Sequence, residues 1–158
     1  MKLGDFIDSQ ALLPKLASVQ RDEVIEELVD ALVTSGSLDS SLRAEVIEQI
    51  LDRERTGSTG FGKGVAVPHV KHESVDKMVA TIGISEQGVD FNALDKAPVY
   101  SVVLLVSPRD KPDEHLQAME NIFRNLQKDT FRRFLRQAGS AEEIQDLIEE
   151  ADTHQLQG

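Results

Sequence analysis

The segment from Val99 to Val106 constrains the fold of this 158-residue chain more than any other. It reads Val-Tyr-Ser-Val-Val-Leu-Leu-Val and is apolar almost throughout. A strand with one solvent-exposed face alternates apolar and polar residues, whereas a nearly continuous apolar run is typical of a strand buried on both faces. The segment therefore predicts a central strand in a sheet whose two faces are both covered.

Apolar residues at helical spacing, together with turn and capping residues, predict helices elsewhere in the chain. The expected helices cover residues 21–34, about 39–54, about 113–127, 131–137, and a last one that begins with a capping box at 140–143 and ends at Glu150. In the helix over 113–127, the inner face is expected to carry Leu116, Met119, Ile122, Phe123 and Leu126. Pro14 limits helix formation in residues 1–18.

Two further strands are predicted, over residues 65–67, where Pro68 ends the pairing, and over residues 78–84. The chain has no internal repeat and no recognisable linker. The simplest architecture is one α/β domain over residues 1–152, with helices covering a sheet, followed by a disordered tail over residues 153–158.

The composition excludes several classes of function. Because the chain has no cysteine, disulfides, thiolate metal sites and cysteine nucleophiles are ruled out. Asp and Glu outnumber Lys and Arg by 28 to 17, for a net charge of -11, so nucleic-acid binding through a basic face is not expected. The acidity either favours a basic protein partner or only keeps the protein soluble. With no signal peptide and no apolar run of about 20 residues, we expect a cytoplasmic protein that does not insert into a membrane.

Four glycines fall within residues 56–64, a density that predicts a loop. The spacing of Gly57, Gly62 and Lys63 fits a nucleotide-binding P-loop, but Gly64 replaces the Ser or Thr that binds magnesium. A P-loop also joins a strand to a helix, whereas this loop follows a predicted helix and enters a predicted strand. The loop is either a plain connector or an anion site, because glycines let backbone amides approach an anion closely.

The chain has four histidines, His69, His72, His115 and His154. His69 follows a predicted strand and a proline, where a sheet end can hold its side chain rigidly. His115 lies in the first turn of a predicted helix, where backbone amides and the helix dipole favour anions. A metal site from the first three is an alternative, but no carboxylate motif accompanies them, and no metal ion or cofactor is predicted. Spacing alone leaves phosphoryl chemistry, metal binding and an ordinary surface role open.

The residues from Arg53 to His69 read Arg-Glu-Arg-Thr-Gly-Ser-Thr-Gly-Phe-Gly-Lys-Gly-Val-Ala-Val-Pro-His. They resemble the signature of enzyme IIA domains of the phosphotransferase system, fructose/mannitol type, and the Gly-Ser-Thr-Gly loop most resembles the nitrogen-regulatory branch. The likeness continues in residues 91–95, 98–99, 103–108 and 115–116, so it covers nearly the whole chain. It implies a mixed β-sheet flanked by helices on both faces, as in mannitol-specific enzyme IIA.

The resemblance also implies a site. His69 is the position that accepts phosphate from an HPr-like phosphocarrier protein, His115 is its phosphate-stabilising partner, and Arg53 orients the phosphate. A phosphate loop is expected at Ser58, Thr59 and Gly60. Read from its neighbours alone, Arg53 is instead a helix-end residue that pairs with Asp52 or Glu54.

The implied function is that of a regulatory phosphocarrier, whose phosphorylated and unphosphorylated forms bind different target proteins. One alternative is a sugar-transport enzyme IIA that hands phosphate to a IIB component of a membrane permease. The other is an interaction module that has lost phosphotransfer.

The chain departs from the family pattern directly after the implied phosphate acceptor. The family usually has a small residue there, most often glycine, whereas this chain has Val70. A β-branched side chain restricts the backbone, so Val70 is expected to crowd that edge of the sheet and to slow phosphorylation or alter the choice of partner.

Overall fold

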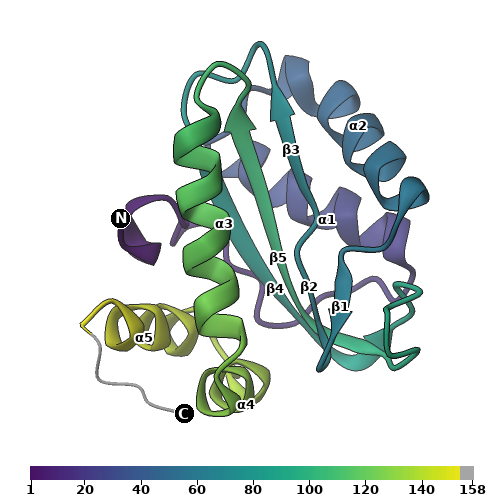
Figure 1. The fold of residues 1–158 in the computed structure, drawn as a ribbon, viewed down its shortest axis with the longest axis vertical. Helices are drawn as coiled ribbons and strands as arrows, with labels where there is room; N and C mark the ends of the chain where they lie inside the picture. Colours follow the sequence, from purple (N-terminus) through teal and green to yellow (C-terminus); the bar gives the residue numbers. More distant parts are fainter. Residues whose placement is uncertain (154–158) are drawn as a thin grey trace.

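The computed structural model describes residues 1–153, which form a three-layer α/β fold (Figure 1). The strands are β1 (Gly60–Gly62), β2 (Val65–Ala66), β3 (His69–His72), β4 (Val79–Val89) and β5 (Val99–Pro108). The helices are α1 (Arg21–Thr34), α2 (Arg43–Thr56), α3 (Pro112–Leu126), α4 (Asp129–Gln137) and α5 (Ala141–Asp152), with short 3₁₀ turns η1 (Leu3–Asp5) and η2 (Ser40–Leu42). The predicted α/β class and the predicted helices are confirmed, with ends that differ by a few residues.

The sheet is mixed and β5 is its central strand. β4 pairs with one edge of β5 in antiparallel orientation, while β2 and β3 pair with the other edge in parallel orientation. β1 runs antiparallel to β2 and extends the sheet on that side. The mixed sheet that the family resemblance implies is therefore confirmed.

Strands β2 and β3 are two parts of one interrupted edge. Val65 lies opposite Ser101 and His69 lies opposite Leu105, so the register along β5 continues across the gap. The gap falls at Pro68, which has no N–H to donate to the ladder. The prediction that Pro68 ends the pairing was incomplete, because the pairing resumes at His69. The glycine-rich segment, predicted as a loop, likewise contains the short strand β1.

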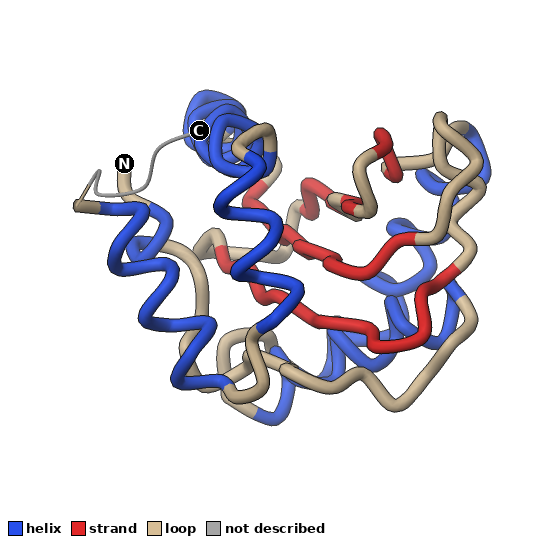
Figure 2. Tube along the Cα trace, turned by 90° about the horizontal axis from the view of Figure 1, so that it is seen from below, coloured by secondary structure: helices blue, strands red, loops and turns tan. Residues whose placement is uncertain are grey.

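Alternate residues of β5 feed two separate hydrophobic cores. Val102, Leu104 and Val106 pack with α1 and α2 on one face of the sheet. Val103 and Leu105 pack with α3, α4 and α5 on the other face. Figure 2 shows the strands between the two groups of helices. Burial of the central strand on both faces, expected from its apolar run, is confirmed.

The inner face of α3 differs from the prediction at Leu116, which is 58% exposed. The buried face of this helix is centred on Ala118 and Ile122 and also includes polar residues such as Asn125. Leu116 lies two positions from Ala118, which at about 100° per residue places it on the opposite side of the helix. The apolar pattern missed this because the buried polar residues were not counted.

The two ends of the described chain are fastened to each other. The Asp152 carboxylate at the end of α5 accepts hydrogen bonds from the backbone N–H groups of Leu3 (2.7 Å) and Gly4 (2.8 Å). Helix α5 therefore extends two residues beyond the predicted end. The predicted tail lies outside the described residues except for Thr153, and so does His154. Within residues 1–153, no helix has the length and apolarity needed to cross a membrane.

Replacing a buried leucine of β5 should destabilise the fold far more than replacing the exposed leucine of α3. Leu104 has no exposed surface, so Leu104→Ala leaves a cavity and should lower the free energy of unfolding by about 3 kcal/mol. Leu116→Ala removes the same atoms from an exposed position and should change it by less than about 0.5 kcal/mol. Urea denaturation of both variants measures the difference, and equal losses would contradict the assigned faces of these elements.

Candidate functional site

His69 is the first residue after the gap in the interrupted edge strand. Its Nδ1–H donates a hydrogen bond to the backbone carbonyl of Val67, at 2.8 Å. Because a carbonyl oxygen only accepts, the proton of the neutral ring is on Nδ1, and Nε2 carries a free lone pair. The break in the ladder at Pro68 thus supplies the acceptor that fixes the tautomer of His69.

His115 faces His69 from helix α3, in the helix layer that covers one face of the sheet. The two rings have centroids 5.6 Å apart and are tilted by 50°. Nδ1 of His115 is 2.7 Å from Oγ of Ser107, a fully buried residue near the end of β5. Ser107 is two residues beyond Leu105, so it points to the α3 face of the sheet. The structure therefore brings together the two histidines that the resemblance singled out.

Both rings are held in their neutral form near pH 7. Burial lowers the pKa of His69, and the positive charges of Arg53 and Lys71 lower it further, against the hydrogen bond to Val67 and the charge of Glu54. Burial also lowers the pKa of His115, to about 4, with added contributions from His69 and Lys71. A neutral imidazole keeps the lone pair that a nucleophile needs.

Arg53 lies in the last turn of α2, and its charge reaches His69. Its Nη1 donates to the backbone carbonyl of Gly57 at 2.6 Å. The alternative reading of Arg53 as an ion-pair partner of its neighbours is wrong, because Asp52 pairs with Arg55 (2.8 Å) and Glu54 binds elsewhere. The guanidinium therefore stays available to an anion beside the histidines.

Glu54, which the sequence analysis did not identify as a site residue, is 3% exposed. Its carboxylate accepts hydrogen bonds from both the backbone N–H and the hydroxyl of Thr59. The Ser58 hydroxyl donates to the carbonyl of Phe91 at 2.5 Å and accepts from the N–H of Gly60 at 3.0 Å. These bonds hold residues 58–60 firmly at the end of α2. The prediction that they bind phosphate stays a prediction, since both hydroxyl protons are directed at protein acceptors here.

The three histidines considered for a metal site do not converge. His72 lies on β3 three residues after His69, so its side chain is on the opposite face of the strand. There its Nδ1 accepts from the N–H of Ser74 (3.0 Å), and its Nε2–H donates to the Glu45 carboxylate (2.9 Å). His72 therefore connects β3 to α2 and takes no part in the pair formed by His69 and His115.

Val70 also points away from that pair. It lies opposite Val106 in the ladder, and its side chain is buried in the core formed with α1 and α2. A β-branched residue suits an extended strand well. The expectation that Val70 crowds the edge beside His69 is not met by this geometry.

Comparison with protein families gives a match to "Phosphoenolpyruvate-dependent sugar phosphotransferase system, EIIA 2" over residues 5–151. The "PTS system fructose-specific EIIABC component" of Bacillus subtilis is 32% identical over 152 residues, which is 96% of this chain and 24% of that protein. The chain thus spans about a quarter of this longer relative.

Two solved structures have the same fold. The "Nitrogen Regulatory Protein IIA-Ntr" from Neisseria meningitidis is 27% identical, with a TM-score of 0.83, over 92% of this chain and 98% of that one. The IIA mannitol structure from Escherichia coli is 21% identical, with a TM-score of 0.74, over 89% of this chain and 97% of that one. The likeness to the nitrogen-regulatory protein and to the mannitol fold agrees with the sequence resemblance.

Acid should destabilise the protein through His115 before the carboxylates titrate. The unfolded ring takes up a proton near pH 6.5, whereas the folded ring does so only near pH 4. The contribution of the neutral His115 ring to the free energy of unfolding is fully present above pH 6.5. It is lost as the pH falls from 6.5 to 4, by at most about 1.4 kcal/mol per pH unit.

Urea denaturation at pH 7 and pH 4.5 measures this loss, with His115→Asn as the control. Asn places a polar atom near Nδ1 but does not titrate, so the wild type should lose about 2 kcal/mol more than the variant over this interval. Parallel losses in the two proteins would show that His115 titrates normally in the folded state.

Proposed function

Because this chain belongs to the EIIA 2 family of the phosphoenolpyruvate-dependent sugar phosphotransferase system, we propose that it carries a phosphoryl group on Nε2 of His69. The observation that supports this most directly is the hydrogen bond from Nδ1 of His69 to the carbonyl of Val67. It leaves Nε2 as the nucleophilic nitrogen, beside His115 and within reach of the charge of Arg53.

In the proposed step, the lone pair of Nε2 attacks phosphorus and forms an N–P bond. The bond between phosphorus and the donor breaks, and its electron pair stays with the donor. Positive charge develops on the ring, and the Nδ1–H bond to Val67 strengthens as it does so. Phosphoryl transfer depends mainly on positioning and on charge stabilisation, which is what surrounding cations and donors supply.

Arg53 supplies a planar pair of N–H donors to the phosphoryl oxygens, and Lys71 supplies a second positive charge on the same face of β3. His115 stays neutral and donates a hydrogen bond from its Nε2–H. For this, its Nδ1 has to accept the hydrogen bond from the Ser107 hydroxyl, at 2.7 Å. Ser107 is thus a positioning residue that selects the tautomer of His115. Residues 58–60 complete the site by holding the end of α2 in place.

The proposed donor is a phosphorylated HPr-like carrier protein. Leu116, beside His115 and 58% exposed, offers an apolar contact next to the phosphate acceptor, and the net charge of -11 suits a basic partner. We infer a regulatory role, in which target proteins distinguish the two forms by the added charge of nearly two units. The likeness to the Neisseria nitrogen-regulatory protein over 98% of that chain supports this choice.

A sugar-transport role is the second candidate, favoured by the fructose-specific relative from Bacillus subtilis. In that case the phosphoryl group passes to a IIB permease component. Transfer from the phosphorylated protein to a purified fructose IIB component, compared with loss of the phosphate in buffer alone, separates the two roles. Rapid and complete transfer supports transport, whereas a phosphate that stays on this chain supports regulation.

Incubation with phosphoenolpyruvate, enzyme I and an HPr-like carrier should add one phosphoryl group, measured by intact mass. His69→Ala should abolish the added mass because the nucleophile is removed. Arg53→Lys and Ser107→Ala should still be phosphorylated, but more slowly, by about tenfold for each, because the first loses the paired donors to the phosphoryl oxygens and the second loses the bond that positions His115. An unmodified wild type would leave the chain as an interaction module without phosphotransfer. Equal phosphate on His69→Ala would mean that another residue accepts the phosphate, and it would overturn the proposal.

Replacing Val70 with the glycine usual in the family should not speed up phosphorylation. Val70→Gly should instead lower the free energy of unfolding by about 3 kcal/mol, through lost burial and the greater freedom of glycine in a strand. Val70→Ala is the matched control, because it removes the β-branch but keeps a side chain. Faster phosphorylation of both variants would restore the idea that Val70 hinders the site.

A further inference from the structure

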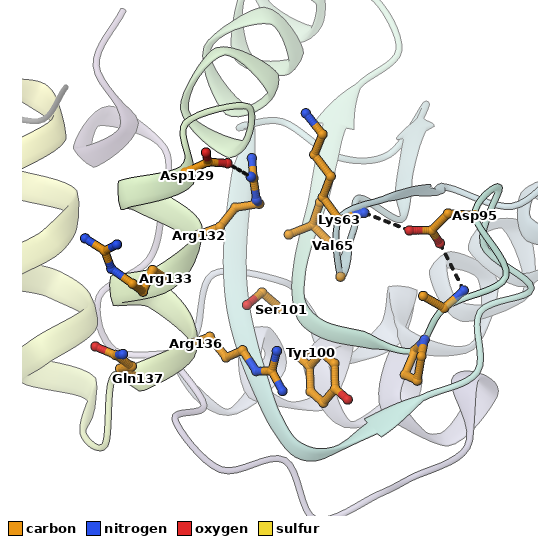
Figure 3. A pocket seen from close by; sticks show the side chains of 13 residues that line it. Lys63, Val65, Asp95, Tyr100, Ser101, Asp129, Arg132, Arg133, Arg136 and Gln137 are labelled. Atoms are coloured by element: carbon orange, nitrogen blue, oxygen red, sulfur yellow. Dashed lines mark hydrogen bonds and ion pairs between the residues drawn. The ribbon is translucent and has the colours of Figure 1, made fainter. Parts of the chain in front are cut away.

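A cleft of about 900 Å³ lies between α4 and the turn that joins β1 to β2 (Figure 3). Its floor includes Val65 and Ser101, which pair in the sheet, whereas His69 pairs with Leu105 four residues further along. At about 3.3 Å per residue, the cleft is roughly 13 Å from His69 along the strands. Neither Arg53 nor the two site histidines line it, so the cleft is separate from the phosphate acceptor.

Positive charge exceeds negative charge in this cleft, although the chain as a whole is strongly acidic. Asp95 and Asp129 line it together with four basic residues, Lys63, Arg132, Arg133 and Arg136. Asp129 pairs with Arg132, and Asp95 accepts backbone N–H bonds from Lys63 and Ala97, both at 3.0 Å. Within residues 1–153, the other three basic side chains form no ion pair. The chain is rich in carboxylates, yet none of those in the described residues pairs with these three side chains, and this favours the binding of an anionic ligand from solution.

Arg136 is held in a geometry that suits an oxyanion. The centre of its guanidinium lies 3.5 Å from the centroid of the Tyr100 ring, so the group rests on the aromatic face. Such stacking leaves the N–H groups at the edge of the guanidinium to donate in pairs to a phosphate or carboxylate. Figure 3 shows Arg136 and Tyr100 side by side at the cleft.

Two glycines hold the Tyr100 ring in place. A Cβ atom on Gly88 would lie 3.2 Å from Cε1 of Tyr100 and 2.9 Å from Cβ of Pro98, and one on Gly64 would lie 3.4 Å from Cδ2 of Tyr100. Both glycines also have positive φ, at +89° and +77°, which other residues rarely adopt. The platform beneath Arg136 is therefore rigid and set by the backbone before any ligand binds.

Lys63 provides a second positive charge on the opposite wall. It lies in the turn between β1 and β2 with φ of 61°, and its N–H bond to Asp95 fixes the turn. Figure 3 shows Lys63 on the wall opposite α4, with Arg132 on the α4 side of the cleft and Arg133 on the side of α4 turned away from Tyr100. A ligand that satisfies both walls needs at least two negative charges.

We propose that this cleft binds a small organic anion with two or more negative charges, either a phosphorylated metabolite or a polycarboxylate. Arg136 grips one charged group with its pair of donors, and Lys63 binds the second. The volume is within the range of pockets that take small molecules. The site gives the protein a second anion-binding function that does not involve phosphoryl transfer to His69.

NMR titration of the ¹⁵N-labelled protein with pyrophosphate and with citrate, at constant ionic strength, tests the proposal. At least one probe should give saturable shifts at Gly64, Tyr100 and α4, with a Kd of about 1 mM or tighter, and acetate should not. Saturation by pyrophosphate alone identifies the phosphate class, and saturation by citrate alone the carboxylate class. Lack of saturation by both, or shifts confined to the surroundings of Arg53 and His69, overturns the proposal.

Three variants make the test specific. Arg136→Lys keeps the charge but loses the planar stacking on Tyr100 and the paired donors, and Lys63→Gln removes the second charge, so each should weaken binding by about tenfold. Lys77→Gln makes the same change in charge as Lys63→Gln at an exposed residue outside the cleft lining and should change Kd by less than about twofold. Equal weakening in all three would mean that general charge attraction, and not a built site, holds the anion. Unchanged thermal unfolding shows that each variant is folded.

Discussion

Strand β5 has neighbours on both edges and helices on both faces, which leaves almost no place for an unpartnered polar group along it. Ser107 is such a group, and burying its hydroxyl without a partner costs about 1–3 kcal/mol. The hydroxyl meets Nδ1 of His115, so α3 is held at the one position along the sheet where this bond forms. His115 faces His69 only from that position. The spacing of the two rings therefore follows from the burial of the central strand.

The charges around the two rings suit the proposed role, in which a phosphoryl group arrives at the site and later leaves it. Burial keeps both imidazoles neutral, while Arg53 and Lys71 remain positive nearby. An imidazolium would attract phosphate equally well, but it would have no lone pair for phosphorus. Separating the nucleophile from the cations solves this conflict, because different residues then perform attraction and attack. The cost is a site that loses stability in acid, where protons favour the unfolded rings.

Patterns in the sequence predicted the parts of the fold that repeat regularly. The apolar run of β5 and the helical spacing in α1 and α2 were sufficient for the α/β class. Strands β1 and β3 were missed because glycines and Pro68 disrupt the local pattern, although β1 pairs with β2 and β3 pairs with β5. Leu116 was placed wrongly because the buried face of α3 is partly polar.

The candidate site was predicted by resemblance and not by pattern. Spacing gave no reason to prefer His69 over His72, although alternation along one strand puts the two on opposite faces. The bond between Ser107 and His115, and the one between Glu54 and Thr59, depend on how β5 meets α3 and on how the chain leaves α2. Such contacts come from the assembled fold. A buried Glu directly after Arg53 has no signature in the sequence that distinguishes it from an exposed helix-end acid.

The fastening of Asp152 to the backbone of Leu3 and Gly4 gives the domain a single point of attachment. Polypeptide joined before Leu3 or after α5 departs from the same corner, on the far side of α3 from β3 (Figure 1). Domains whose ends lie together can be added to longer chains without distortion, and the Bacillus subtilis relative matches this chain over only 24% of its own length. His69, the proposed phosphate acceptor, would then face outward from a tethered module, free to meet one protein after another.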